Sequence, residues 1–442
     1  MNYKNEFIGN EDQLMTVTEA KLCQGRQEGV KEIRIDNGGN LSITLLPDRS
    51  MDIYQIRYKG KNLNYIGPCG IVAPTYYNER GIEWLRSFFV GFLTTLGLQH
   101  MGGDIVVNGE PRGLHGKESS CPAENVTITR GIENGTPTVT VEGTMREARL
   151  FGENLRLKRS LKFFYELDKM ELTDTIENYG YGTTQYYLGY HINYGYPLLD
   201  AGTEVKVNNG GKDPMPRNEY SASFPESWKH VTAPAYPYPE RCYFYDMEAD
   251  ENGKTGYSIF NDKLGLGVKV SYDKEVLPKF CQWQMFGKGE YVCGLEPICC
   301  DMDAPHIGEE GCPAPVLGPG ESRTYKLCFE FVDNKEEKMI RFTLHSFLKP
   351  EKVEEYKTLH ANTWPGVLSM IEKCHIHHYS ISIRGTELFT YYEYDGDDYE
   401  ADMAMMDADP VTQEWWKHTR PCFLYHDQGV YYDDLEEIFY AP

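Results

Sequence analysis

The sequence predicts a chain of two domains with different folds, an all-β sandwich over residues 1–332 and an α+β domain over residues 339–442, joined by a linker at 333–338. Three observations support this prediction. A chain of 442 residues is much longer than the roughly 100–200 residues of a typical domain. Its first three quarters read as short extended runs, and the period of the apolar residues changes after Phe331. A change of class within one chain indicates a fusion of two cores.

The first region consists of short runs with period-two alternation, separated by Gly, Asn, Asp and Pro. Alternation of this kind, interrupted about every ten residues by turn formers, is typical of a β-sandwich. Helical patterns are scarce there. The clearest runs are Glu32–Ile35, Leu41–Leu45, Val126–Thr129, Thr138–Val141 and Thr324–Phe331.

The second region has the order strand, helix, strand, strand, helix, strand, which is the ferredoxin-like arrangement. A helix is predicted to start at Pro350, because proline suits the first helical turn, and to continue to about Lys373. The remaining expected elements are strands at Met339–Phe347, Tyr379–Ile383 and Leu388–Tyr394, a helix at Tyr399–Thr419 broken near Pro410, and a closing segment at Gly429–Tyr440.

Charge and composition exclude some partners. A net charge of −23 argues against nucleic acid or an anionic membrane, which need clustered Lys and Arg. The 33 tyrosines and 42 glycines suit aromatic-lined sites on a turn-rich surface. The first residues contain no apolar run, so we expect neither a secretion signal nor a membrane anchor, and a cytoplasmic protein. The 12 cysteines are scattered and are expected to be reduced thiols.

The segment Cys374-His375-Ile376-His377-His378 is the one cluster that could suggest a metal ion. Alternating donors on an extended segment point to opposite faces, so all four cannot converge on one ion. We therefore expect no metal site, and no cofactor.

Tyr356, His360 and Trp364 are spaced four residues apart, which on one helix would place them along one face. Interconversion of sugar anomers needs a proton delivered to the ring oxygen and another removed from the anomeric hydroxyl. An imidazole that titrates near neutrality can do either. On spacing alone, the partly buried face of an amphipathic helix is the favoured alternative.

Residues 339–442 resemble the L-rhamnose mutarotase family. The motifs are Met339-Ile340-Arg341, the block Glu-Glu-Tyr-x-x-x-His-x-x-x-Trp-Pro at 354–365, Tyr379 after two histidines, Trp415-Trp416-Lys417 and Leu435–Tyr440. The resemblance implies a ferredoxin-like, dimeric α/β-barrel fold and a homodimer. It also implies that His360 is the proton donor and that Tyr356, Tyr379, Trp415 and Trp416 line a sugar pocket. The family commonly has Asn directly after the histidine, where this chain has Ala361, so the role of Asn362 is open.

His115, His191 and Glu296 are the candidates for chemistry in the first domain. Each lies beside or close to Gly or Pro near a predicted strand end, where loops present side chains. A histidine acid opposed by a carboxylate base is sufficient for mutarotation. The alternative is that three polar residues from a large β domain carry no meaning.

Leu114-His115-Gly116, His191 followed by Asn193, and Gly294-Leu295-Glu296 resemble, in order, the galactose mutarotase superfamily. The runs Pro47–Ile53 and Leu93–Leu98 look closer to its aldose-epimerase-like branch. The resemblance implies the galactose mutarotase-like supersandwich, with His191 as acid, Glu296 as base and His115 as a sugar-oxygen ligand. Arg86 is a candidate hydroxyl ligand, weighed evenly against a surface arginine, and His100 is a candidate pocket residue.

These observations predict a tandem sugar mutarotase, an isomerase whose partners are monosaccharides. The second domain would act on L-rhamnose or a similar deoxy-hexose, and the first on the same or a related aldose. Two alternatives concern the first domain, which would be a non-catalytic sugar-binding module or an enzyme that isomerises or cleaves a sugar derivative.

Overall fold

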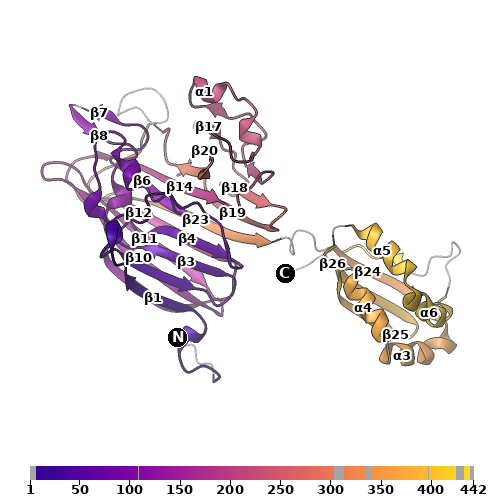
Figure 1. Ribbon diagram of the computed structural model, residues 1–442. Helices are drawn as coiled ribbons and strands as arrows, with labels where there is room; N and C mark the ends of the chain where they lie inside the picture. The colour runs from indigo at the N-terminus through magenta and orange to yellow at the C-terminus, as the bar shows by residue number, and fades with distance from the viewer. Residues whose placement is uncertain are drawn as a thin grey trace. The chain divides into compact units, whose positions relative to one another are not determined.

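The computed structural model describes residues 6–107, 109–302, 313–333, 340–396, 398–424 and 433–438. The chain divides into two compact units, Met1–Val332 and Asp333–Pro442, drawn in Figure 1.

The first unit is built from two large antiparallel sheets. The 11-stranded sheet contains, in spatial order, β1 (Thr16–Lys21), β2 (Lys31–Asp36), β3 (Leu41–Leu46), β4 (Asp52–Tyr58), β6 (Leu93–Leu98), β14 (Tyr187–Gly195), β21 (Glu290–Ile298), β20 (Lys279–Gly287), β17 (Arg241–Asp246) and β16 (Met215–Pro216), with β5 (Lys61–Asn62) paired to β4. The 8-stranded sheet contains β15 (Glu204–Val207), β18 (Lys254–Asn261), β19 (Leu266–Asp273), β23 (Ser322–Asp333), β12 (Lys169–Asn178), β11 (Asn154–Phe164), β10 (Thr136–Ala148) and β9 (Glu124–Glu133).

Short elements complete this unit. Two small ribbons pair β7 (Ile105–Val107) with β8 (Glu110–Arg112), and β13 (Thr184–Gln185) with β22 (Val316–Leu317). The helical segments are α1 (Glu219–Ala222) and the 3-10 turns η1 (Glu11–Gln13), η2 (Gly25–Gln27), η3 (Pro74–Tyr76), η4 (Glu83–Arg86), η5 (Glu118–Ser120) and η6 (Ser227–Lys229).

One apolar core is shared by the two large sheets, as the alternating runs predict. Leu45 and Ile192 of the larger sheet belong to the same buried cluster as Leu157, Leu172 and Leu327 of the smaller one. Figure 1 shows the strands of the two sheets layered over one another. The predicted all-β supersandwich is confirmed.

A buried arginine links the two sheets through this core. Arg159 of β11 bonds to Asp174 of β12 through two nitrogens, at 2.9 and 2.7 Å, and its Nη1 lies 2.9 Å from Asp52 Oδ1 on β4 of the other sheet. All three side chains are 0–1% exposed. Because removing one member of a buried ion cluster leaves its partners charged and unpaired, this cluster is sensitive to substitution.

We therefore expect Arg159→Met to lower the unfolding free energy of the first domain by about 3–5 kcal/mol. Chemical unfolding measures this difference. The matched control is Lys158→Met on the same strand, where the exposed pair with Glu177 is worth at most ~1 kcal/mol. Equal losses for the two variants would contradict the importance of the buried cluster.

The second unit has the predicted ferredoxin-like order. Its elements are β24 (Ile340–Phe347), α3 (Val353–Ala361), α4 (Pro365–Lys373), β25 (Ile376–Arg384), β26 (Glu387–Tyr394), α5 (Tyr399–Ala408), α6 (Pro410–Thr419) and β27 (Asp433–Asp434), with 3-10 turns η7 (Pro350–Lys352) and η8 (Arg420–Cys422). The sheet order is β25-β26-β24-β27. Helix residues such as Met370 and Met403 pack on Leu344, Ile376 and Tyr394 of the sheet.

Two details of this unit correct the sequence-based prediction. The helix expected to continue to Lys373 is interrupted between α3 and α4, because Trp364 precedes Pro365 and adopts the extended conformation that a following proline imposes. Within the described residues, the closing strand contains only Asp433–Asp434, and residues 435–438 lie outside it. Residues 429–432, 439 and 440 of the expected closing segment lie outside the described part.

The cysteine and histidine cluster does not converge. Cys374 is buried and donates to the Asp402 carbonyl, whereas His377 and His378 bond to Asp395 and Glu393, respectively. The 11 cysteines that the structure describes are free thiols.

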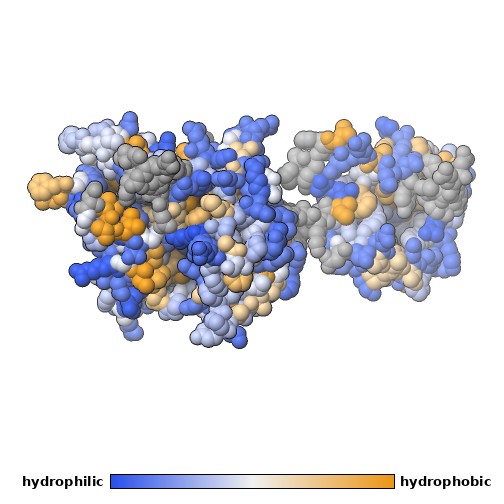
Figure 2. Space-filling view, turned by 90° about the horizontal axis from the view of Figure 1, so that it is seen from above, coloured by the Kyte–Doolittle hydropathy of each residue, from blue (hydrophilic) through white to orange (hydrophobic). Residues whose placement is uncertain are grey.

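The molecular surface reflects the acidic, polar composition. The face in Figure 2 is largely hydrophilic, with hydrophobic side chains in small patches. Within the described residues, no helix has the length and apolar character needed to cross a bilayer.

Candidate functional site

His191 and Glu296 meet on neighbouring strands of the larger sheet. His191 Nε2 lies 3.3 Å from Glu296 Oε1, and the two residues are only 4% and 1% exposed. The sequence placed both near strand ends. This prediction is wrong for His191, which is central in β14, whereas Glu296 lies close to the end of β21. Antiparallel pairing of these strands aligns Ile192 with Leu295, which brings the histidine and the carboxylate side by side.

Glycine and aromatic residues shape the space around this pair. A Cβ at Gly294 would lie 2.8 Å from Glu296 Oε1 and 3.0 Å from His191 Cε1, so this position needs glycine to admit both side chains. The rings of Phe88 and Trp283 each lie 5.3 Å from the His191 ring, edge to face. The pair therefore lies in an aromatic-walled, water-poor site.

His115 joins the same site from a loop. Its backbone has φ +59°, and its ring lies 6.1 Å from that of His191 and 5.0 Å from that of Trp84. The Gly102 amide donates to His115 Nδ1 at 3.3 Å, which places the ring hydrogen of neutral His115 on Nε2. His115 can thus offer a neutral N–H to an oxygen.

Burial controls the protonation of these groups. It raises the pKa of Glu296 well above the usual carboxyl value and lowers the pKa of His191 to about 4. Burial, followed by the nearby His191 and Arg217, also lowers the pKa of His115. Burial consequently favours the neutral form of both groups, a protonated carboxyl beside a neutral imidazole. Within the described residues, His191 Nδ1 and Glu296 Oε2 have no hydrogen-bond partner.

Arg217 and Trp283 were missed by the sequence analysis. The Arg217 charge lowers the pKa of Glu296. The backbone amide of Arg217 donates to the Cys242 carbonyl. Trp283 bonds through Nε1 to Glu240 at 2.8 Å. Neither lies in a motif, and only the pairing of β16, β17, β20 and β21 brings them to the histidine.

Arg86 lies outside this group, whereas His100 is near enough to His115 to help lower its pKa, after the larger effects of burial, His191 and Arg217. The Arg86 side chain is 74% exposed and bonds to Glu83 on the same turn, η4. His100 Nε2 lies 2.5 Å from the Gly103 carbonyl, and its ring lies 6.0 Å from that of Tyr187. The role of Arg86 as a hydroxyl ligand and that of His100 as a pocket residue stay predictions.

Two fully buried carboxylates lie beneath the His115 loop. Glu118 accepts a hydrogen bond from Ser50 at 2.8 Å, and Glu147 accepts one from the Leu98 amide at 2.9 Å. A carboxylate oxygen of each lies within 4.8 Å of the other and of the Cys121 sulfur. Burial, followed by repulsion from Glu147, raises the pKa of Glu118 to about 8.

This raised pKa predicts a pH-dependent stability. The unfolded state releases the Glu118 proton near its ordinary pKa of 4.5, whereas the folded state keeps it to about 8, so the stabilisation is lost as pH rises between these values. We expect Glu118→Gln, which stays neutral, to raise the melting temperature over wild type by several degrees more at pH 8 than at pH 5. Glu142→Gln, at an exposed position of β10, is the control, and a pH-independent difference for Glu118→Gln would refute the shift.

In the second unit, His360 is oriented by its own helix. His360 Nδ1 lies 3.1 Å from the Tyr356 carbonyl, so a neutral ring donates from Nδ1 and leaves Nε2 as an acceptor. The His360 ring lies 4.1 Å from the Tyr356 ring and 5.5 Å from the buried Trp415 ring. Burial lowers the pKa of His360. An imidazole with one fixed nitrogen and aromatic neighbours is suited to proton transfer at a sugar.

The remaining predicted residues of this unit separate into two groups. Tyr379 of β25 is 45% exposed, stacks 5.6 Å from Tyr392, and is near enough to Tyr356 to raise its pKa, after the larger effect of burial. Trp416, the next residue on α6, contacts the Arg420 guanidinium, which lies 4.1 Å from its ring centroid. A pocket role for Trp416 therefore stays a prediction.

The break between the helices decides the positions of Trp364 and Asn362. Trp364 is not on the helix of His360, yet it packs 5.3 Å from Trp415. Asn362 donates to the Thr358 carbonyl at the end of α3.

The comparisons with known proteins assign the two halves separately. Residues 27–331 match a family model described as "Domain of unknown function (DUF4432)", and residues 341–441 match one described as L-rhamnose mutarotase. The L-rhamnose mutarotase of Bacillus subtilis is 35% identical over 97 residues, which are 21% of this chain and 90% of that protein. That of Shouchella clausii is 29% identical over 105 residues, 23% of this chain and 98% of that protein.

Solved structures share the fold of the first unit. A crystal structure of a candidate aldose 1-epimerase from Klebsiella pneumoniae superposes with a TM-score of 0.67 at 24% identity, over 73% of this chain and 86% of that one. A galactose mutarotase-like protein from Clostridium acetobutylicum gives a TM-score of 0.52 at 14% identity, over 72% and 98%. At these identities the likeness establishes the fold.

Proposed function

We propose that each domain of this sugar mutarotase interconverts anomers at its own site. The chain belongs to the DUF4432 family through residues 27–331 and to the L-rhamnose mutarotase family through residues 341–441. The second domain acts on L-rhamnose or a similar deoxy-hexose, and the first on the same or a related aldose. The observation that carries the proposal is that each domain places an imidazole among aromatic rings. In the first domain the imidazole has a carboxyl partner, and in the second it has a defined free nitrogen.

In the first domain, His191 and Glu296 act as the acid and base pair. When a sugar enters, the single proton of the pair passes from Glu296 to His191; His191 then delivers it to the ring oxygen while the carboxylate of Glu296 takes the anomeric hydroxyl proton. The bond between C1 and the ring oxygen then breaks, and the aldehyde forms. Rotation about C1–C2 and the reverse transfers give the other anomer. His115 donates to a sugar oxygen through Nε2, and Arg217 favours the ionised form of Glu296.

In the second domain, His360 is the proton-transfer group. Because its pKa is lowered, the neutral ring with a free Nε2 dominates at neutral pH and accepts the anomeric proton first. The protonated ring then delivers that proton to the ring oxygen as the bond between C1 and the ring oxygen breaks, which makes His360 the proton donor that the resemblance implies; ring closure reverses both transfers. Tyr356, Tyr379 and Trp415 line the pocket, and the exposed Tyr379 leaves one side open to the sugar.

A homodimer of the second domain follows from the same proposal. On the sheet face away from the helices, the rings of Phe347 and Phe389 lie 4.6 and 4.9 Å from the His345 ring, and these three side chains are only partly buried. An aromatic sheet face of this kind supports a partner sheet. The free thiols support a reducing, cytoplasmic compartment.

The test is exchange NMR of anomer interconversion by the full chain. The panel is L-rhamnose, L-fucose, D-galactose and a sulfonated hexose. We expect L-rhamnose to exchange faster than in buffer. We also expect at least one sugar to exchange faster than in buffer when His360 is replaced by Ala. No accelerated exchange with any of these sugars would overturn the proposal.

A further inference from the structure

The turn between β3 and β4 carries the motif Pro47–Ile53, to which the proposed mechanism assigns no role. Two consecutive residues of this turn, Ser50 and Met51, have φ of +57° and +52° although neither is glycine. A non-glycine residue in this region costs about 1–3 kcal/mol and persists where the surrounding structure holds it. Strain of this kind at buried positions indicates that the turn has a specific task.

Arg49, in the same turn, binds three separate segments of the chain. Its Nε donates to the Ser119 carbonyl at 2.7 Å, its Nη1 to the Val72 carbonyl at 2.7 Å and its Nη2 to the Ser87 carbonyl at 3.0 Å. The residue is buried, and burial lowers its pKa to about 10, so the guanidinium stays charged at neutral pH. A planar guanidinium has the fixed donor directions that carbonyls on three segments require.

The segment of Ser87 forms the aromatic wall of the candidate site. Phe88 follows directly, and its ring lies 5.3 Å from that of His191. Trp84 precedes it on η4, stacks 4.2 Å from Phe88 and lies 5.0 Å from the His115 ring. A shift of the Ser87 carbonyl would therefore move both rings that enclose the two histidines.

The other two segments hold the turn of His115. Ser119 lies on η5, four residues after His115 in the chain. Tyr77, five residues after Val72, donates through its hydroxyl to the carbonyl of Gly116, the residue next to His115, at 3.1 Å. The three carbonyls bound by the guanidinium thus lie on segments that contact this histidine or its aromatic wall.

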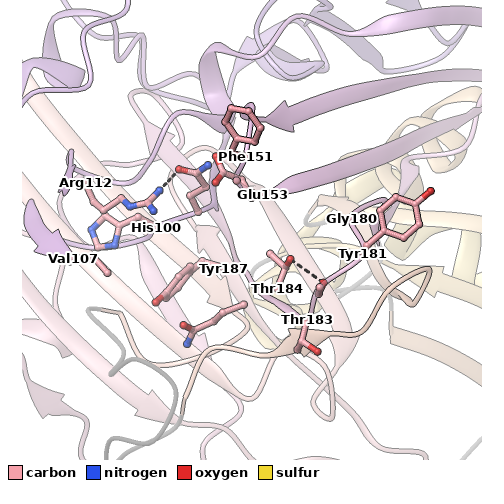
Figure 3. A pocket seen from close by; sticks show the side chains of 14 residues that line it. His100, Val107, Arg112, Phe151, Glu153, Gly180, Tyr181, Thr183, Thr184 and Tyr187 are labelled. Atoms are coloured by element: carbon pink, nitrogen blue, oxygen red, sulfur yellow. Dashed lines mark hydrogen bonds between the residues drawn. The ribbon is translucent and has the colours of Figure 1, made fainter. Parts of the chain in front are cut away.

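The turn of His115 is also bonded to the segment after β6, which borders a cavity. The Gly102 amide donates to His115 Nδ1 at 3.3 Å, and the Gly102 carbonyl accepts from the His115 amide at 2.9 Å. Gln99 and His100 of this segment line a cavity of about 420 Å³, which Figure 3 shows with His100 and Arg112 at its wall. Because open space adjoins this support, close packing does not fix it, and the buried guanidinium supplies the rigid support.

We propose that Arg49 is a positioning residue of the first domain, whose guanidinium sets the place of His115 directly and through the aromatic wall. The proposal rests on the proposed mutarotase function of this domain. It gives a role to the strained turn and its motif. If the arginine served stability alone, its replacement would lower the melting temperature without any effect that depends on His115.

The test uses the full chain with His360→Ala, so that only the first domain contributes. Exchange NMR of L-rhamnose, L-fucose, D-galactose and a sulfonated hexose identifies the sugar that this domain interconverts. Arg49→Lys keeps the charge but loses the planar fork of donors. We expect it to lower kcat/KM for that sugar by about 10²-fold, since small misplacements in a site have effects of this size. Arg57→Lys, the same replacement at an exposed position of β4, is the matched control and should leave kcat/KM unchanged.

A double-mutant cycle separates positioning from stability. Because Arg49 acts through His115 in this proposal, Arg49→Lys should lose most of its effect on kcat/KM in a chain that already carries His115→Ala. Both backgrounds are measured well below their melting temperatures, so that the folded fraction does not enter the comparison. An equal loss in the two backgrounds would overturn the proposal.

Nitrogen NMR of labelled histidine tests the proposal without any exchange of a sugar. The His115 ring should show one tautomer, with its hydrogen on Nε2, and His115→Ala assigns the signal. We expect Arg49→Lys to shift this signal towards the average of two tautomers. Arg49→Gln, which removes the buried charge, serves if the lysine variant does not fold.

The two measurements distinguish the possible failures. A folded Arg49 variant with an unchanged His115 signal would overturn the positioning role, even if the parent chain interconverts a sugar. A changed signal in a chain that accelerates no exchange would support the positioning role and contradict the proposed function of the first domain.

Discussion

Replacement of His360 by Ala is expected to slow L-rhamnose anomer exchange by the second domain about 10²–10⁴-fold, the range of general acid–base catalysis. The free Nε2 is held by the bond from Nδ1 to the Tyr356 carbonyl, and alanine leaves no group in its place. Because burial lowers the pKa of His360, wild-type activity should be constant through neutral pH and should decline only when acid protonates the imidazole.

The control for this prediction is Lys357→Ala on the same helix. Lys357 pairs with Glu354 at the surface, and its replacement should leave exchange unchanged. Both variants are measured in a chain that carries Glu296→Gln, so that the first domain does not contribute. Undiminished L-rhamnose exchange in His360→Ala would remove His360 from the proposed mechanism.

The sequence predicted the architecture well because alternation and turn residues are local signals. The strands at Leu41–Leu45 and Leu388–Tyr394 and the break near Pro410 were all recognised from short windows. The interruption before Pro365 carried an equally local signal, since proline disfavours a helical conformation in the residue before it, but the spacing of Tyr356, His360 and Trp364 suggested one continuous helix.

The candidate sites were less predictable, because they depend on contacts between distant segments. His191 and Glu296 were found through motifs, and their contact arises only from the pairing of β14 with β21. Arg217 and Trp283 have no motif and reach the site through further strand pairings. Trp415 packs on His360 while its neighbour Trp416 contacts Arg420, because neighbours on a helix are 100° apart, which adjacent tryptophans in a sequence do not reveal.

Replacement of Glu296 by Gln is the second large effect that we expect, a loss of about 10²–10⁴-fold in exchange by the first domain. The glutamine side chain keeps the shape and can still bond to His191, so folding and sugar binding should persist. With His360→Ala in the same chain, the remaining activity belongs to the first domain alone. Glu290→Gln, exposed on the same strand, is the matched control.

The pH profile separates catalysis from binding in this domain. The pair is active with one shared proton, so wild-type activity should decline in acid as His191 gains a second proton near pH 4, and in alkali as Glu296 loses the last one well above 4.5. The amide of the Glu296→Gln variant cannot ionise, so the alkaline limb attributed to Glu296 should disappear from whatever activity remains. If Glu296→Gln left both the rate and this limb intact, the first domain would be a sugar-binding module rather than a second catalyst.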